Sequence, residues 1–120
     1  MIAVRLAIGA RGDLVSAEAA GHAGRGPAGA DIVCAAATVL LRTTLAFLSK
    51  EAGVAVEANT AGRGTLSFRV TAFQEAALPL LRYAGGFLLE GLGSLEREYP
   101  GAVDVQVERL PNERTRTVEE

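Results

Sequence analysis

Alternating apolar and polar residues along the chain predict five short strands. Ile2, Val4, Leu6 and Ile8 are separated by small or charged residues, a period of two that is typical of a strand with one buried face. The turn at residues 10–13 then reverses the chain into a less apolar strand over about 14–20. A second hairpin is expected from the alternation at 54–57 and 66–70, with a glycine-containing turn between them, and a last strand over 103–107.

Two longer segments show helical patterns instead. Strong helix formers run from Asp31 to about Glu51, and this segment is apolar on more than one side. We therefore expect the first helix to pack against both the sheet and a second helix, and to lie largely buried. The second helix is predicted from Glu75 or Pro79 to Glu98, with leucines at helical spacing.

Four glycines lie inside the second predicted helix, at positions 85, 86, 91 and 93. Each costs about 1 kcal/mol relative to alanine in a helix interior. Such a cost is offset where another backbone approaches closely, so we expect a neighbouring helix or a second subunit at this surface.

The order strand, strand, helix, strand, strand, helix, strand predicts an α+β fold, with the two helices packed on an antiparallel or mixed sheet of four to five strands. The sequence has 120 residues, of which 49% are apolar, which is enough for one compact core. We assign residues 1–108 to a single domain. Residues 109–120 are polar and lack periodicity, so we expect a disordered tail there.

Charge and composition exclude several classes of function. The net charge is −2 and the basic residues are scattered, which does not favour direct binding to nucleic acid. The longest apolar stretch, residues 32–41, is about half a membrane span, so we expect a soluble, cytoplasmic protein with no membrane partner. One cysteine and one histidine cannot form an internal disulfide or a four-ligand zinc site unaided, and we expect neither a metal nor a cofactor.

The candidate chemistry lies between residues 21 and 38. Asp31 is expected to be the N-cap of the first helix, which would place Cys34 in the first helical turn. Backbone amides there lack intrahelical partners and the helix dipole is positive, so a thiolate would be stabilised and an oxyanion could be bound. His22 lies at the end of the second predicted strand and is a candidate base for Cys34.

Between the histidine and the helix, glycines and a proline predict an irregular, mobile loop. Its residues are Ala23, Gly24, Arg25, Gly26, Pro27, Ala28, Gly29 and Ala30. Such a loop could bring the imidazole to the sulfur. It is not a phosphate-binding loop, because the Gly-Lys-Ser/Thr ending is missing and the charge of Asp31 would repel phosphate.

The residues alone leave two interpretations of Cys34 open. A single unpaired cysteine is often a small buried apolar side chain with no chemical role. The position at a helix start, with the only histidine nearby, favours a nucleophile instead.

The segment Gly21-His22-Ala23-Gly24, followed by Gly29 and by residues 31–36 with the sequence DIVCAA, resembles the ribosomal-processing cysteine proteases of the Prp family. The resemblance extends more loosely over the chain except for the tail. It implies a catalytic dyad of Cys34 and His22, a loop that reshapes around the substrate, and a homodimer. It also implies the substrate, a bacterial large-subunit ribosomal protein whose N-terminal extension is removed.

Two departures from the family are visible. Family members often carry serine where this chain has Thr38, which retains a hydroxyl one helical turn beyond Cys34. Pro27 would stiffen the loop between the histidine and the helix. The alternative function is a non-catalytic homodimeric module that binds a ribosomal or assembly partner.

Overall fold

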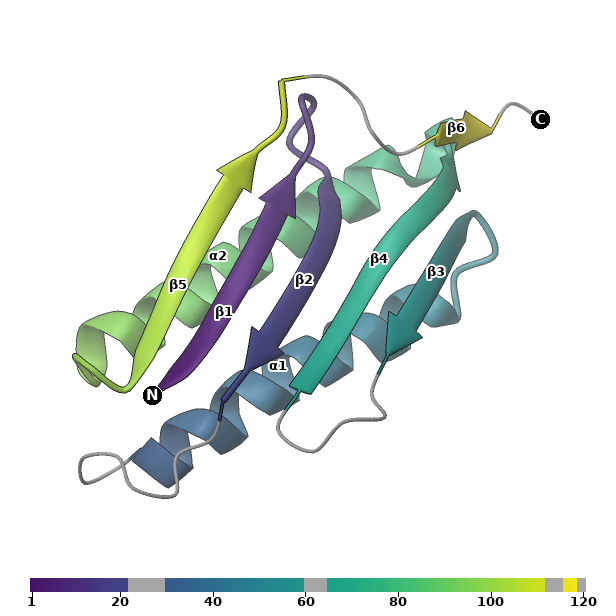
Figure 1. Ribbon diagram of the computed structural model, residues 1–120. Helices are drawn as coiled ribbons and strands as arrows, with labels where there is room; N and C mark the ends of the chain where they lie inside the picture. The colour runs from purple at the N-terminus through teal and green to yellow at the C-terminus, as the bar shows by residue number, and fades with distance from the viewer. Residues whose placement is uncertain (22–29, 60–64, 112–115, 119–120) are drawn as a thin grey trace.

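The structure is a computed structural model that describes residues 1–21, 30–59, 65–111 and 116–118. One mixed sheet forms one layer and two long helices form the other (Figure 1). Both helices cover the same face of the sheet, so its opposite face is left uncovered. The predicted α+β class and the order of its elements are confirmed.

The elements follow one another as predicted from the hydrophobic pattern, with one addition at the C-terminal end. They are β1 (Ile2–Ile8), β2 (Leu14–Ala20), α1 (Ala30–Ser49), β3 (Val54–Asn59), β4 (Thr65–Gln74), a 3-10 turn (Glu75–Ala77), α2 (Leu78–Glu98), β5 (Val103–Arg109) and β6 (Arg116–Val118).

The strands lie side by side in the order β3-β4-β2-β1-β5. Neighbours in this series are antiparallel except β1 and β5, which are parallel. Chain neighbours therefore form the two hairpins, β1 with β2 and β3 with β4. Pairing between residues distant in the sequence joins β2 to β4 and β1 to β5.

The alternation in β1 places Ile2, Val4 and Leu6 against the helices, while Ala3 and Arg5 are exposed on the uncovered face of the sheet. The turn into β2 is closed by a hydrogen bond from the Gly9 amide to the Asp13 carbonyl, 2.8 Å long. The core therefore lies between one face of the sheet and the inner sides of both helices.

Residues 116–118 differ from the disordered tail that the sequence predicts. They form β6, which pairs in parallel with Ala72–Gln74 at the end of β4. The pairing of β2 with β4 covers residues 65–69 only, so the last residues of β4 have free backbone groups on that edge. A polar segment can fill such an edge, because the ladder is made by the backbone and needs no apolar pattern.

Helix α1 is less buried than the sequence predicts. Val33, Ala37, Leu41 and Leu48 face the core, but Ile32, Val39 and Phe47 are 64%, 61% and 60% exposed. The described residues form only two layers, and none of them adds a further layer on the outer side of α1. The apolar residues on the outer side of α1 therefore form an exposed apolar surface, and the helix is not completely buried.

The apolar segment of α1 is also longer than the stretch over residues 32–41 that was identified from the sequence. Residues Ile32–Ser49 reach a mean hydropathy of 1.8 over 18 residues, which by length and composition alone would suffice to cross a membrane. In the fold, the buried side of the same segment packs on the sheet, as in the core helix of a globular domain.

The glycines of α2 have different surroundings. A Cβ at Gly85 would lie 3.2 Å from Ile8 Cδ1 and 3.4 Å from the carbonyl oxygen of Gly12, so α2 packs here directly on the β1–β2 hairpin. A Cβ at Gly91 would lie 3.0 Å from Leu40 Cδ1 of α1. The predicted close approach to a neighbouring helix is thus confirmed at Gly91, whereas nothing lies within 4 Å at Gly86.

We predict that alanine at the adjacent positions Gly85 and Gly86 changes the free energy of unfolding in opposite directions. Gly85→Ala is expected to lower the free energy of unfolding by about 1–2 kcal/mol, because the methyl group would press on the buried Ile8 side chain. Gly86→Ala is expected to raise it by about 0.5–1 kcal/mol, because the helix gains propensity without a clash. Urea denaturation in dilute solution measures both, and equal shifts for the two variants would contradict the packing described.

Candidate active site

Cys34 lies near the N-terminal end of α1, as its fifth residue. The helix begins at Ala30, so the backbone of Asp31 lies inside the first turn and not before it as an N-cap. This corrects the predicted start and places Cys34 just beyond the first turn. With Asp31 as the N-cap, Ile32 would be the first helical residue, so the helix starts two residues earlier than predicted.

Cys34 is still close to the free backbone amides of α1, although it follows the first turn. The free amides of a helix are those of its first four residues, here residues 30–33. Cα–Cβ bonds in a helix tilt toward its N-terminus, so the side chain of residue 34 leans back over that first turn. A thiolate at this position would still lie close to the positive end of the helix dipole.

The side chain of Cys34 is a free thiol that is partly buried against the core. Val33 before it and Ala37 one turn later are fully buried, whereas Ile32 is exposed. Cys34 therefore lies at the boundary between the helix face that packs on the sheet and the face that meets solvent. The buried neighbours hold the helix against the sheet, and Cys34 itself is partly open to solvent.

Thr38 follows Cys34 by four residues, so its side chain lies on the same side of α1 one turn further on. It is half-buried. Thr44, in the same helix, donates its hydroxyl to the Leu40 carbonyl at 2.8 Å. Within the described part of the chain no such bond is found for Thr38, so its hydroxyl remains available to a bound molecule.

His22 and loop residues 23–29 lie outside the described residues, as do the side chains of Ala30 and Asp31. The described chain stops at Gly21, which follows the last residue of β2. Gly21 has φ +104° and a Cβ there would lie 2.8 Å from the Met1 carbonyl oxygen, so this position requires glycine. The end of β2 and the start of α1 lie at the same end of the molecule (Figure 1).

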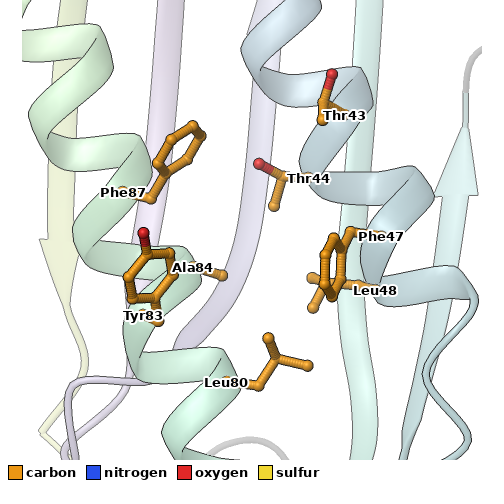
Figure 2. Close-up of a pocket in the computed structure, with 8 residues that line it drawn as sticks. All are labelled: Thr43, Thr44, Phe47, Leu48, Leu80, Tyr83, Ala84 and Phe87. Carbon is orange, nitrogen blue, oxygen red and sulfur yellow. The ribbon is translucent and has the colours of Figure 1, made fainter.

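One depression lies between the two helices, and another lies beside the end of β2. An entirely apolar groove of about 210 Å³ lies between α1 and α2, toward the C-terminal half of α1 (Figure 2). It has no titratable side chain suited to proton transfer at a peptide bond. Its lining residues are Thr43, Thr44, Phe47, Leu48, Leu80, Tyr83, Ala84 and Phe87.

The second depression lies on the sheet and reaches Ala20 and Thr65, which places it two residues before His22 in the chain. Its wall includes Arg5 and Glu18, whose side chains form an exposed ion pair with an N–O distance of 3.7 Å. Sequence analysis missed this surface. The only available signal was the run of small and polar residues at the outward positions of β1 and β2.

Among the described residues, no group of three or more His, Cys, Asp or Glu side chains could hold a metal ion. The chemistry visible at the start of α1 is therefore that of a single thiol near free backbone amides.

Several solved structures are similar to this one. The structure superposes on that of the ribosomal processing protease Prp from Staphylococcus aureus, with a covalently linked product peptide, at a TM-score of 0.72 and 22% identity over 90% of this chain and 100% of that chain. The same protease with a substrate peptide gives 0.70 and 21% over 92% and 100%. The SMU.848 protein from Streptococcus mutans gives 0.72 and 25% over 92% and 96%.

A sequence search of curated proteins found no match. The model of the family described as "Cysteine protease Prp" matches residues 1–104, which is most of the chain. This match extends from β1 into the start of β5 and includes the whole of α1. The chain therefore belongs to the Prp family of cysteine proteases.

Proposed function

We propose that this chain is an endopeptidase in which Cys34 is the nucleophile and His22 is the base. One observation carries the assignment. The chain belongs to a family of cysteine proteases and contains a single cysteine and a single histidine. The thiol lies near the start of a helix, partly exposed, just beyond the free amides of the first turn.

The reaction follows from these groups. His22 takes the proton from Sγ, and the thiolate attacks the carbonyl carbon of the scissile peptide bond. The free backbone amides of the first turn of α1 are the proposed donors for the oxyanion that forms. The imidazolium then protonates the leaving amine, and water hydrolyses the thioester, which returns the proton to His22 and frees the carboxylate product.

The proposed substrate is a large-subunit ribosomal protein with an N-terminal extension, which the enzyme removes in the cytoplasm during ribosome maturation. Support comes from the structural similarity to a ribosomal processing protease with substrate and product peptides bound.

The first test is cleavage itself. Incubation of the purified protein with the extended ribosomal protein of the same organism is expected to remove the extension, detected by intact-mass measurement. Cys34→Ala and His22→Ala are both expected to reduce cleavage to background, because neither a nucleophile nor its base can be replaced by a methyl group. Binding of the substrate without cleavage by the unmodified chain would favour the alternative, a non-catalytic binding module.

Thiol reactivity gives a second test that needs no substrate. Because Cys34 is the only cysteine, iodoacetamide labelling followed by mass spectrometry reports on this thiol alone. Labelling near neutral pH is expected to be faster than that of glutathione, and His22→Ala is expected to slow it by about tenfold or more. A rate independent of His22 would contradict the proposed pairing.

Thr38 is proposed to support the site through its hydroxyl. Thr38→Val removes the hydroxyl at nearly constant volume and is expected to lower kcat/KM by about tenfold, as the loss of one hydrogen bond to a bound substrate would do. Thr38→Ser retains the hydroxyl and is the matched control, for which activity near that of the unmodified chain is expected. Equal loss in both variants would indicate a packing role.

A homodimer is also part of the proposal. The exposed apolar side chains of the helix layer, among them Val39, Phe47 and Tyr83, support it, because a large exposed apolar surface is unusual for a monomer.

A further inference from the structure

A depression at the end of β5 is lined by three arginines that belong to different elements. Arg11 lies in the β1–β2 turn, Arg82 in α2 and Arg109 at the end of β5. The depression lies at the opposite end of the sheet from the start of α1, which carries Cys34 (Figure 1). Catalysis at Cys34 therefore gives no reason for these arginines, although gathering like charges costs free energy.

Two carboxylates offset part of this charge. Glu75 accepts a hydrogen bond from Arg11 and forms an ion pair with it. Asp13 follows in the same turn and is fully buried, and neither of its carboxylate oxygens has a hydrogen-bond partner among the described residues. This carboxylate lies against Gly9, which lines the depression, since a Cβ there would be 2.5 Å from Oδ1. A buried carboxylate without hydrogen bonds needs positive charge nearby, and the arginines supply it.

One positive charge is left over at this depression. Three guanidinium groups stand against the two carboxylates of Glu75 and Asp13. Neither Arg82 nor Arg109 has an ion-pair partner among the described residues. Arg82 lies across the turn, with Nε 3.8 Å from the position of a Cβ on Gly12. The depression is therefore complementary in charge to a single anionic group.

The rest of the wall indicates what carries that anionic group. Leu78 and Leu110 are half-buried and line the same depression. Among the described residues that line it there is no aromatic ring on which a nucleic-acid base could stack. An acidic side chain of a polypeptide, with an apolar residue beside it, fits this combination better than a phosphate of a nucleic acid.

The outer edge of β5 leads into this depression. One edge of β5 pairs with β1, and β5 is the end strand of the sheet. On the other edge the Val105 amide donates a hydrogen bond to Glu96 Oε2, 3.0 Å away. Because backbone groups alternate along a strand, those of Val107 and Arg109 point to the same edge, where no described residue pairs with them. An extended peptide can add to such an edge as a further strand.

We propose that this edge and the depression together form a docking site for an extended acidic segment of a partner polypeptide. The backbone of the segment pairs with Val107 and Arg109, and one of its carboxylates lies between the guanidinium groups of Arg82 and Arg109. Its apolar neighbour contacts Leu78 and Leu110. The site goes beyond the proposed cleavage reaction and does not depend on it.

The test is an NMR titration of the ¹⁵N-labelled chain with Cys34→Ala, which cannot cleave the probe. The probe is the capped peptide acetyl-Thr-Val-Glu-Leu-Thr-Val-amide at millimolar concentration. Its addition is expected to shift the amide signals of Val107 and Arg109. Two altered probes are each expected to bind about tenfold more weakly, one with glutamine in place of glutamate and one with alternate backbone amides methylated.

Variants of the arginines locate the carboxylate. Arg82→Gln and Arg109→Gln are each expected to weaken binding of the glutamate peptide about fivefold or more and to leave binding of the glutamine peptide unchanged. Arg82→Lys keeps the charge beside Asp13 and is expected to retain most of the affinity, so it tests the site even where Arg82→Gln does not fold. Arg42→Gln, an equal loss of charge at an exposed position of α1, is the matched control.

Several results would overturn the docking site. They are no shift at Val107 and Arg109, equal binding of the glutamate and glutamine peptides, and binding that is insensitive to amide methylation. A larger response of the same signals to a single-stranded RNA oligonucleotide than to the peptide would overturn the assignment to a polypeptide. Cleavage by Cys34 is measured separately, so the proposed function is unaffected by each of these results.

Discussion

The position of Cys34 depends on the packing of the inner face of α1 against the sheet. Val33 and Ala37, which flank it on that face, are fully buried, so the first turns of the helix cannot rotate or slide without loss of core contacts. The thiol is therefore held at a defined place at one end of the sheet. In the sequence, His22 follows β2 with only Gly21 between them, so the two proposed catalytic residues belong to different segments of the chain.

Helix α2 has a different role in the same layer, and its glycines show it. Gly85 and Gly91 allow the helix to lie close to the hairpin on one side and to α1 on another, and together they define where the second helix sits. Gly86, adjacent in sequence, points the other way and serves no contact within the described chain. Gly85 and Gly86 thus lie on different sides of α2, and only Gly85 is needed for packing within the described chain.

Much of the fold could be predicted from the sequence because the strands and helices have clear periods of two and of about 3.6 residues. The first strand, both hairpins and the span of α2 agree closely with the pattern. What failed depended on pairing between distant segments or on the number of layers. Nothing in the sequence of residues 116–118 indicates a strand, because the free edge of β4 induces this strand. The apolar residues of α1 could not show by themselves that no third layer of described residues covers the helix.

The candidate site was predicted in part. Cys34 does lie near a helix start, but the helix begins two residues earlier than predicted, because Asp31 is a common N-cap residue and nothing in the pattern favours Ala30 as the first helical residue. The place of His22 remains a prediction, since that residue lies outside the described chain. The depression beside β2 could not be predicted, because it arises from residues of several strands that only the sheet brings together.

The parallel pairing of β1 with β5 has a consequence for how the chain folds during synthesis. Ile2 is paired with Val103, so β1 pairs on one side with a strand that is synthesised long after it. The β1–β2 hairpin can close early, but the other edge of β1 lacks this partner until β5 has been synthesised. Contacts of such large sequence separation slow folding, and the open, apolar strand β1 is the part of the nascent chain most exposed to aggregation before β5 arrives.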